Sequence, residues 1–122
     1  MIKVMVVDDE TDVQILFQQQ FRRELKAGLI MFHFSFSGED ALKFLVEHEA
    51  TDLVLILADI NMPGMSGLEL LRRIKEKNSS MKVFMITAYG DEKNHQLARQ
   101  YGCDDYLTKP IDFEDLKRKI LG

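Results

Sequence analysis

Leu53-Val54-Leu55-Ile56-Leu57-Ala58 is a run of six apolar residues that ends directly at an acidic residue, Asp59. Six residues are far fewer than the about 20 that a membrane-spanning helix needs. Apolar residues at every position, rather than at every second one, are typical of a central parallel strand that helices cover on both faces. The run therefore predicts a parallel sheet, with Asp59 at the carboxyl end of one of its central strands.

Strand and helix patterns alternate on both sides of this run. The strands that we expect are Ile2–Val7, Ile30–Phe36, Leu53–Ala58, Lys82–Thr87 and Asp104–Thr108. Apolar spacing and N-cap residues indicate the helices. These are a stretch carrying Val13, Leu16, Phe17, Phe21 and Leu25, then Ser37 to about Glu49, Ser66 to about Lys77, Asp91–Tyr101, and a last helix capped by Asp112. The order is (βα)5, which implies right-handed crossovers and helices on both faces of the sheet.

The alternation favours one α/β fold class. A five-stranded doubly wound sheet in a single domain, residues 1–122, is most simply flavodoxin-like with strand order 2-1-3-4-5. In this order a ligand crevice lies beyond the carboxyl ends of the strands, near the first and third. We also expect the stripe of Phe32, Phe34 and Phe36 to face the core.

Composition limits the class of protein. The chain has 16 Lys and Arg against 20 Asp and Glu, a net charge of −4, which argues against a nucleic-acid-binding module. The start of the chain lacks the basic region and cleavage site of a signal peptide. A lone cysteine, Cys103, leaves neither an intrachain disulfide nor a cysteine-based metal cluster. We therefore expect a cytoplasmic protein that does not enter the membrane.

Polar residues follow four of the five expected strands. Asp8 and Asp9 follow the first, Asp59 the third and Lys109 the fifth, while Thr87 ends the fourth. Each has an ordinary explanation when taken alone, such as acidic residues at a helix N-terminus or an aspartate in a turn. Because the carboxyl ends of parallel strands share one edge of the sheet, however, all five side chains should converge on the predicted crevice.

This combination of groups suits phosphoryl chemistry. Three close carboxylates would repel one another unless a cation joined them. Oxygen ligands with water suit Mg²⁺, for which Mn²⁺ should substitute. The metal and Lys109 would neutralise phosphoryl oxygens while Thr87 donates a hydrogen bond. Asp59 is then free to act as the nucleophile and to become an aspartyl phosphate.

Four ordered stretches carry a family resemblance: Val6–Glu10, Ala58–Gly67, Ile86–Ala88 and Asp105–Pro110. Together they resemble the response regulator receiver domain of two-component signal transduction, of the chemotaxis-response-regulator type, over the whole chain. The resemblance implies that a histidine kinase or phosphotransfer protein phosphorylates Asp59. It also implies a switch that catalyses only its own phosphorylation and dephosphorylation, rather than an enzyme.

The resemblance assigns the metal ligands. Asp9, Asp59 and the backbone carbonyl of Asn61 would hold Mg²⁺ directly, and Asp8 would act largely through water. It also implies that hydrolysis is controlled by Asn61 and Tyr89, which lie two residues beyond Asp59 and Thr87.

The resemblance further implies how the signal leaves the site. Thr87 and Lys109 would bind the phosphoryl oxygens, and Tyr106 would turn inward when Thr87 is drawn to the phosphate. The Lys109–Pro110 bond would be cis, a conformation essentially restricted to bonds before proline. The output surface would be the fourth helix, fifth strand and fifth helix, acting on an output domain, a downstream protein or a phosphorylation-dependent homodimer. The helix expected over Asp91–Tyr101 has the poorest apolar face, so it should shift most easily.

Two other classes share part of this chemistry. A haloacid-dehalogenase-like phosphatase places its nucleophile on the first strand as Asp-x-Asp, whereas Asp59 here is followed by Ile60 and Asn61. A flavodoxin-type FMN carrier needs a Ser/Thr-rich phosphate loop after the first strand. Asp8-Asp9-Glu10 would repel the phosphate there, and no tryptophan is present to stack on the flavin.

Overall fold

The computed structural model describes residues 1–48, 52–88 and 90–122. Within them, five strands form one parallel sheet with the order β2-β1-β3-β4-β5. The strands are β1 (Ile2–Val7), β2 (Ile30–Ser35), β3 (Leu53–Asp59), β4 (Lys82–Thr87) and β5 (Asp105–Thr108). This arrangement confirms the flavodoxin-like fold and the strand order expected from the sequence.

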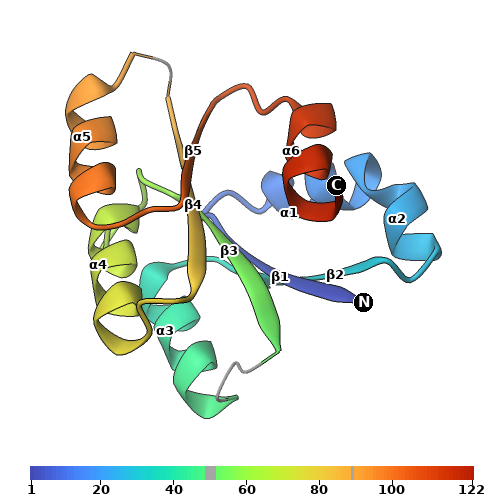
Figure 1. Cartoon of the computed structure of the whole chain (residues 1–122), viewed down its shortest axis with the longest axis horizontal. Coiled ribbons are helices and arrows are strands. Elements are labelled where there is room, and N and C mark those ends of the chain that lie inside the picture. Colours follow the sequence, from blue (N-terminus) through green and yellow to red (C-terminus); the bar gives the residue numbers. More distant parts are fainter. Residues whose placement is uncertain (49–51, 89) are drawn as a thin grey trace.

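Helices cover both faces of the sheet. They are α1 (Asp12–Gln20), α2 (Arg22–Lys26), α3 (Gly38–Glu47), α4 (Gly67–Lys77), α5 (Glu92–Gln100) and α6 (Phe113–Leu121). Figure 1 shows α3, α4 and α5 on one face and α1, α2 and α6 on the other. In the described part of the chain, none of these helices is both long and apolar enough to cross a membrane.

The apolar run in β3 serves two separate cores. Leu55 and Leu57 are buried in the core under α1 and α6, whereas Ile56 and Ala58 are buried in the core under α3 and α4. Successive side chains of a strand point to opposite faces. A central strand between two layers of helices therefore needs an apolar side chain at every position, as expected.

Apart from one-residue shifts at the ends of β3, β5 and α5, the structure differs from the expectations in three places, and the helix end expected near Glu49 lies outside the described residues. The first helix is interrupted at Phe21, although the hydrogen bonds from Phe21 N to Phe17 O and from Leu25 N to Phe21 O continue across the break. Leu16 is 41% exposed because it precedes the buried Phe17 by one residue, which turns it about 100° away. Phe36, expected in the core, is 39% exposed because β2 ends one residue earlier.

Candidate functional site

The carboxyl edge of the sheet gathers the polar residues that the sequence placed after the strands. Val7 of β1 pairs with Ala58 of β3, so Asp8 and Asp59 follow side by side. Thr87 reaches the same edge at the end of β4, next to β3. The side chains of Asp8, Asp59 and Thr87 are buried, with only 5%, 3% and 1% of their surface exposed. The strand ends therefore create a polar site in which these three side chains are shielded from solvent.

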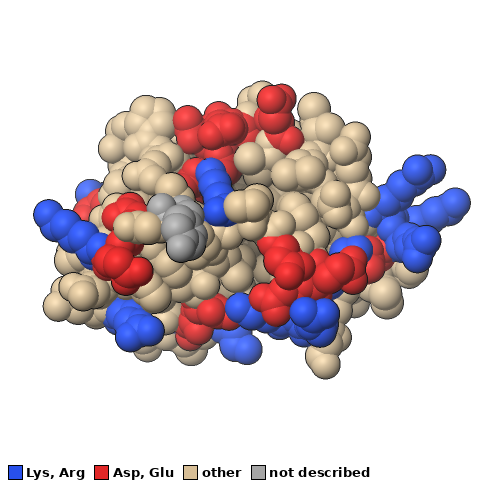
Figure 2. All heavy atoms as spheres, turned by 90° about the horizontal axis from the view of Figure 1, so that it is seen from above, with Lys and Arg blue, Asp and Glu red and all other residues tan. Residues whose placement is uncertain are grey.

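Three acidic residues of this site lie close enough to share one cation. Asp8, Asp9 and Asp59 each offer a carboxylate oxygen within 4.8 Å of the others. Asp9 is exposed, so the group is open to solvent on one side. Figure 2, which views the molecule from above, shows acidic side chains gathered beside a basic one on this face. Hard oxygen donors with an open side suit Mg²⁺, which keeps part of its water shell.

The pKa of Asp8 is raised by its position in this group. Burial raises its pKa to about 6, and the charge of Asp59 acts in the same direction. A hydrogen bond from the backbone N–H of Glu10 to Asp8 Oδ1, 2.9 Å long, opposes the rise. A bound cation would favour the ionised form of all three carboxylates. The donor set of the site therefore fits a divalent metal ion.

Lys109 places a positive charge beside the acidic residues even without a bound metal ion. Its Nζ lies 3.0 Å from Asp59 Oδ2 and 3.9 Å from Asp8 Oδ2. Burial alone would lower the pKa of Lys109, but the hydrogen bond to Asp59 and the charges of both carboxylates outweigh burial and raise it. The backbone N–H of Lys109 donates to Thr87 O at 2.8 Å, and the following Lys109–Pro110 bond is cis. Lys109 therefore stays charged beside Asp59.

Backbone hydrogen bonds of the loop after β3 fix the position of Asp59. The N–H of Asn61 donates to Asp59 Oδ1 at 3.1 Å, and the N–H of Gly67 donates to Ile60 O at 2.9 Å. A Cβ atom on Gly67 would lie 2.1 Å from the carbonyl oxygen of Asp59. Only glycine allows the start of α4 to approach the backbone of Asp59 this closely.

Asp91 connects the site to α5. Thr87 Oγ1 donates to Asp91 Oδ2 at 3.5 Å, and the same carboxylate accepts from the N–H of Asn94 and so caps α5. The Tyr106 hydroxyl donates to the backbone oxygen of Asp91 at 3.3 Å. The Tyr106 ring also stacks on His95 of α5. The hydroxyl next to the site, the start of α5 and the expected switch residue thus meet at Asp91.

The sequence assigned no role in the site to Asp91 or His95. Asp91 followed by Asn94 is a local capping pattern, which indicates a helix start but not a contact with Thr87. The contact of His95 with Tyr106 has no local signal because it joins a helix to a strand. Tyr89, expected beside the water path, lies outside the described residues.

Comparison with known proteins decides the family. The model of the response regulator receiver domain family matches residues 4–121. The chain belongs to this family. As a receiver domain it is a phosphoacceptor signalling module, and the family implies partners of the histidine kinase and phosphotransfer class.

Relatives support the assignment along the whole receiver domain. Sporulation initiation phosphotransferase F of Bacillus subtilis is 33% identical over 118 residues, which are 97% of this chain and 90% of that protein. The chain spans only 49% of response regulator RppA of Synechocystis, to which it is 30% identical.

Solved structures agree with this result. A receiver domain protein from Clostridium thermocellum is 28% identical with a TM-score of 0.86, over 98% of this chain and 91% of that one. TrrA from Thermotoga maritima, solved in complex with Mg²⁺ and BeF, is 32% identical with a TM-score of 0.78, over 98% and 96% of the two chains.

Proposed function

We propose that this receiver domain accepts a phosphoryl group on Asp59 in a Mg²⁺-dependent reaction. The observation that carries the proposal is the position of Asp59, which is buried between two further carboxylates and the ammonium group of Lys109 at 3.0 Å. A carboxylate held against one cation, and beside a site for a second, can act as a nucleophile while its surroundings stabilise the incoming phosphoryl oxygens.

The metal site proposed here consists of Asp9, Asp59 and the backbone carbonyl of Asn61, with Asp8 acting largely through water. When bound, Mg²⁺ would neutralise charge on the phosphoryl oxygens, and Mn²⁺ should replace it. The closeness of the three carboxylate oxygens supports this assignment. The TrrA structure, solved with Mg²⁺ and BeF, shows that a 32% identical receiver binds such a pair.

The covalent step transfers the phosphoryl group from a phosphohistidine of a sensor kinase or phosphotransfer protein. A carboxylate oxygen of Asp59 forms a bond to phosphorus, the phosphorus–nitrogen bond breaks, and its electron pair stays on the histidine. Lys109 and the Thr87 hydroxyl bind the phosphoryl oxygens. Hydrolysis later transfers the group to water, with Asn61 and Tyr89 controlling access of the water molecule.

The kinase or phosphotransfer protein docks over α1 in this proposal. Ile15 and Leu16 of α1 are 55% and 41% exposed, and they follow closely after the acidic loop. A depression of about 400 Å³ lies beside them and includes Glu10. Exposed apolar side chains next to a reactive group mark a surface suited to protein contact.

The output surface proposed is α5, β5 and α6. Drawing Thr87 toward a phosphoryl group removes its hydrogen bond to Asp91, which caps α5. Tyr106 then has a new position available, and an output domain, a downstream protein or a second phosphorylated copy can bind the altered surface.

Phosphorylation with a small donor tests this function. Acetyl phosphate with Mg²⁺ should add the mass of one phosphoryl group to the intact protein. Asp59→Asn should abolish the labelling, whereas Asp40→Asn, at an exposed position on α3, should label like the wild type. Equal labelling of Asp59→Asn, or no effect of a chelator, would contradict the assignment.

A further inference from the structure

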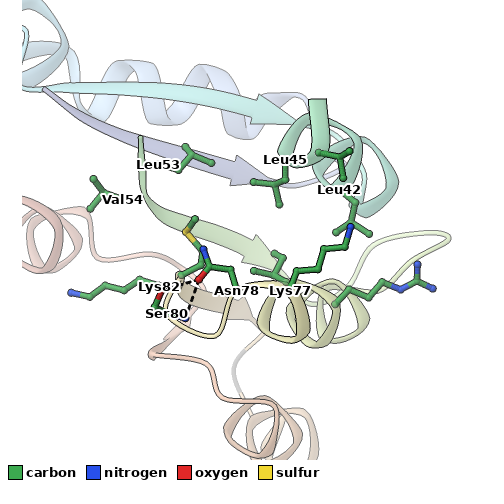
Figure 3. A pocket seen from close by; sticks show the side chains of 12 residues that line it. Leu42, Leu45, Leu53, Val54, Lys77, Asn78, Ser80 and Lys82 are labelled. Atoms are coloured by element: carbon green, nitrogen blue, oxygen red, sulfur yellow. Dashed lines mark hydrogen bonds between the residues drawn. The ribbon is translucent and has the colours of Figure 1, made fainter. Parts of the chain in front are cut away.

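A cavity lies at the edge of the sheet opposite the phosphorylation site. It is formed between α3 and α4, where β3 and β4 begin (Figure 3), and has a volume of about 570 Å³. Ligand sites in proteins usually occupy about 300–1,000 Å³. Leu53 lines the cavity and Asp59 ends the same strand, so at about 3.3 Å per residue the two sites are about 20 Å apart.

The walls of this cavity are largely apolar. Its buried or half-buried lining residues include Leu42, Leu45, Leu53, Ile74 and Met81. Val46 and Val54 also line it, and 61% and 48% of their surfaces are exposed. Contact with an alkyl chain would remove the apolar surface of these valines from water, which is favourable in free energy.

The charged side chains in the described lining of the cavity are all basic. Arg73, Lys77 and Lys82 line it, and none of the described lining residues is acidic. Within the described part of the chain neither Lys77 nor Lys82 forms an ion pair, whereas Arg73 pairs with Glu69 at 3.0 Å. Figure 3 shows Lys77 extending from the end of α4 toward α3, while Lys82 points outward. Lys77 is thus the cation best placed at the opening.

We propose that this cavity binds a small anionic amphiphile, an alkyl chain that ends in a carboxylate. The chain occupies the apolar space between α3 and α4, and the carboxylate pairs with Lys77. Charge complementarity favours an anion, because every charged residue among the described lining is basic. The size favours a small molecule, since about 570 Å³ lies within the usual volume range of small-molecule sites.

Lys77 also has a structural role that the test must separate from ligand binding. It lies in the last turn of α4, where a cation complements the negative end of the helix dipole. A purely structural Lys77 would affect thermal stability when replaced but would not distinguish one ligand from another.

The test titrates the ¹⁵N-labelled protein with decanoate below its critical micelle concentration. Saturable amide shifts are expected in residues 42–48, 52–54 and 73–82. Decanol, which has the same chain but no charge, should bind about fivefold more weakly, and decyltrimethylammonium should cause no shifts in these residues. Decanol binding as tightly as decanoate, shifts centred on Ile15 and Leu16, or saturation only above the micelle concentration would each overturn the proposal.

Variants make the test specific to the cavity. Lys77→Glu should weaken decanoate binding about tenfold, since an attraction becomes a repulsion, and Val54→Asp should weaken it by a similar factor. Lys93→Glu, a charge reversal at an exposed position on α5, should bind like the wild type, with thermal unfolding showing that each variant is folded. Asp59→Asn should also bind decanoate normally, so the result does not depend on phosphorylation. Unchanged binding by Lys77→Glu would overturn the proposal.

Discussion

The phenol ring of Tyr106 on β5 stacks against the imidazole ring of His95 on α5, with ring centroids 3.8 Å apart and ring planes 10° apart. The hydroxyl of the same tyrosine donates to the backbone oxygen of Asp91, directly before α5. Tyr106 is therefore held by α5 at its ring and at its hydroxyl. A change in the position of Tyr106 must alter its contacts with α5.

The first prediction concerns His95→Ala. Loss of the stack should remove about 0.5–1.5 kcal/mol of ring–ring contact and speed hydrogen exchange of the α5 amides. Labelling by acetyl phosphate should stay normal, because His95 does not contact the acidic site. His48→Ala, which removes a similar stack on Phe44, is the control and should leave exchange in α5 unchanged. Equal exchange in α5 for both variants and the wild type would show that the stack does not hold this helix.

The second prediction concerns Thr87→Ala. Beryllofluoride with Mg²⁺, standing in for the phosphoryl group, should shift amide signals of the wild type most within Thr87–Lys109. The variant should still be phosphorylated. Its amide shifts in α5 and β5 should be smaller, because alanine has no hydroxyl group that could move from Asp91 to the phosphoryl group. Thr108→Ala, which alters an exposed threonine paired with Thr87 in the sheet, should respond like the wild type. A wild-type response confined to Asp8, Asp9 and Asp59 would exclude the switch.

The third prediction concerns pH and the metal. Because the folded state raises the pKa of Asp8 from 3.8 to about 6, it binds a proton more tightly than the unfolded chain does. The contribution of Asp8 to stability is therefore favourable below about pH 4 and is lost as the pH rises through about 6. In EDTA, the free energy of unfolding of Asp8→Asn should therefore increase by about 1–3 kcal/mol relative to that of the wild type as the pH rises from about 4 to about 6.

Urea unfolding at several pH values measures this difference. Mg²⁺ at neutral pH should stabilise the wild type more than Asp8→Asn, because the ion relieves the repulsion among the carboxylates. Asp40→Asn is the control for the metal, and Mg²⁺ should stabilise it as much as it stabilises the wild type. A pH-independent difference for Asp8→Asn would mean that burial does not penalise its charge.

The fourth prediction concerns Gly67→Ala. The added methyl group would lie 2.1 Å from the carbonyl oxygen of Asp59, so the start of α4 or the end of β3 must move. We expect a loss of about 1–3 kcal/mol in the free energy of unfolding, together with weaker phosphorylation of Asp59. Gly28→Ala is the control: its positive φ of 73° makes it costly too, but nothing lies within 4 Å. Gly28→Ala should therefore be less stable than the wild type but be phosphorylated normally. Normal phosphorylation of Gly67→Ala would show that the close approach of Gly67 to Asp59 does not matter for the reaction.

The sequence by itself determined the sheet and the meeting of Asp8, Asp9, Asp59 and Lys109. Both follow from local patterns, because apolar runs and capping residues set the strand–helix alternation and parallel strands place their carboxyl ends along one edge. Thr87 was also placed at this edge for that reason.

Only the tertiary structure decided the contacts between elements. The stack of His95 on Tyr106, the approach of Gly67 to Asp59 and the cavity at Lys77 each depend on how a helix packs against a strand or another helix. The exposure of Phe36 likewise depends on where β2 leaves the ladder. A local pattern fixes which face of an element is apolar, but the distance and angle between two elements result from the packing of all side chains between them.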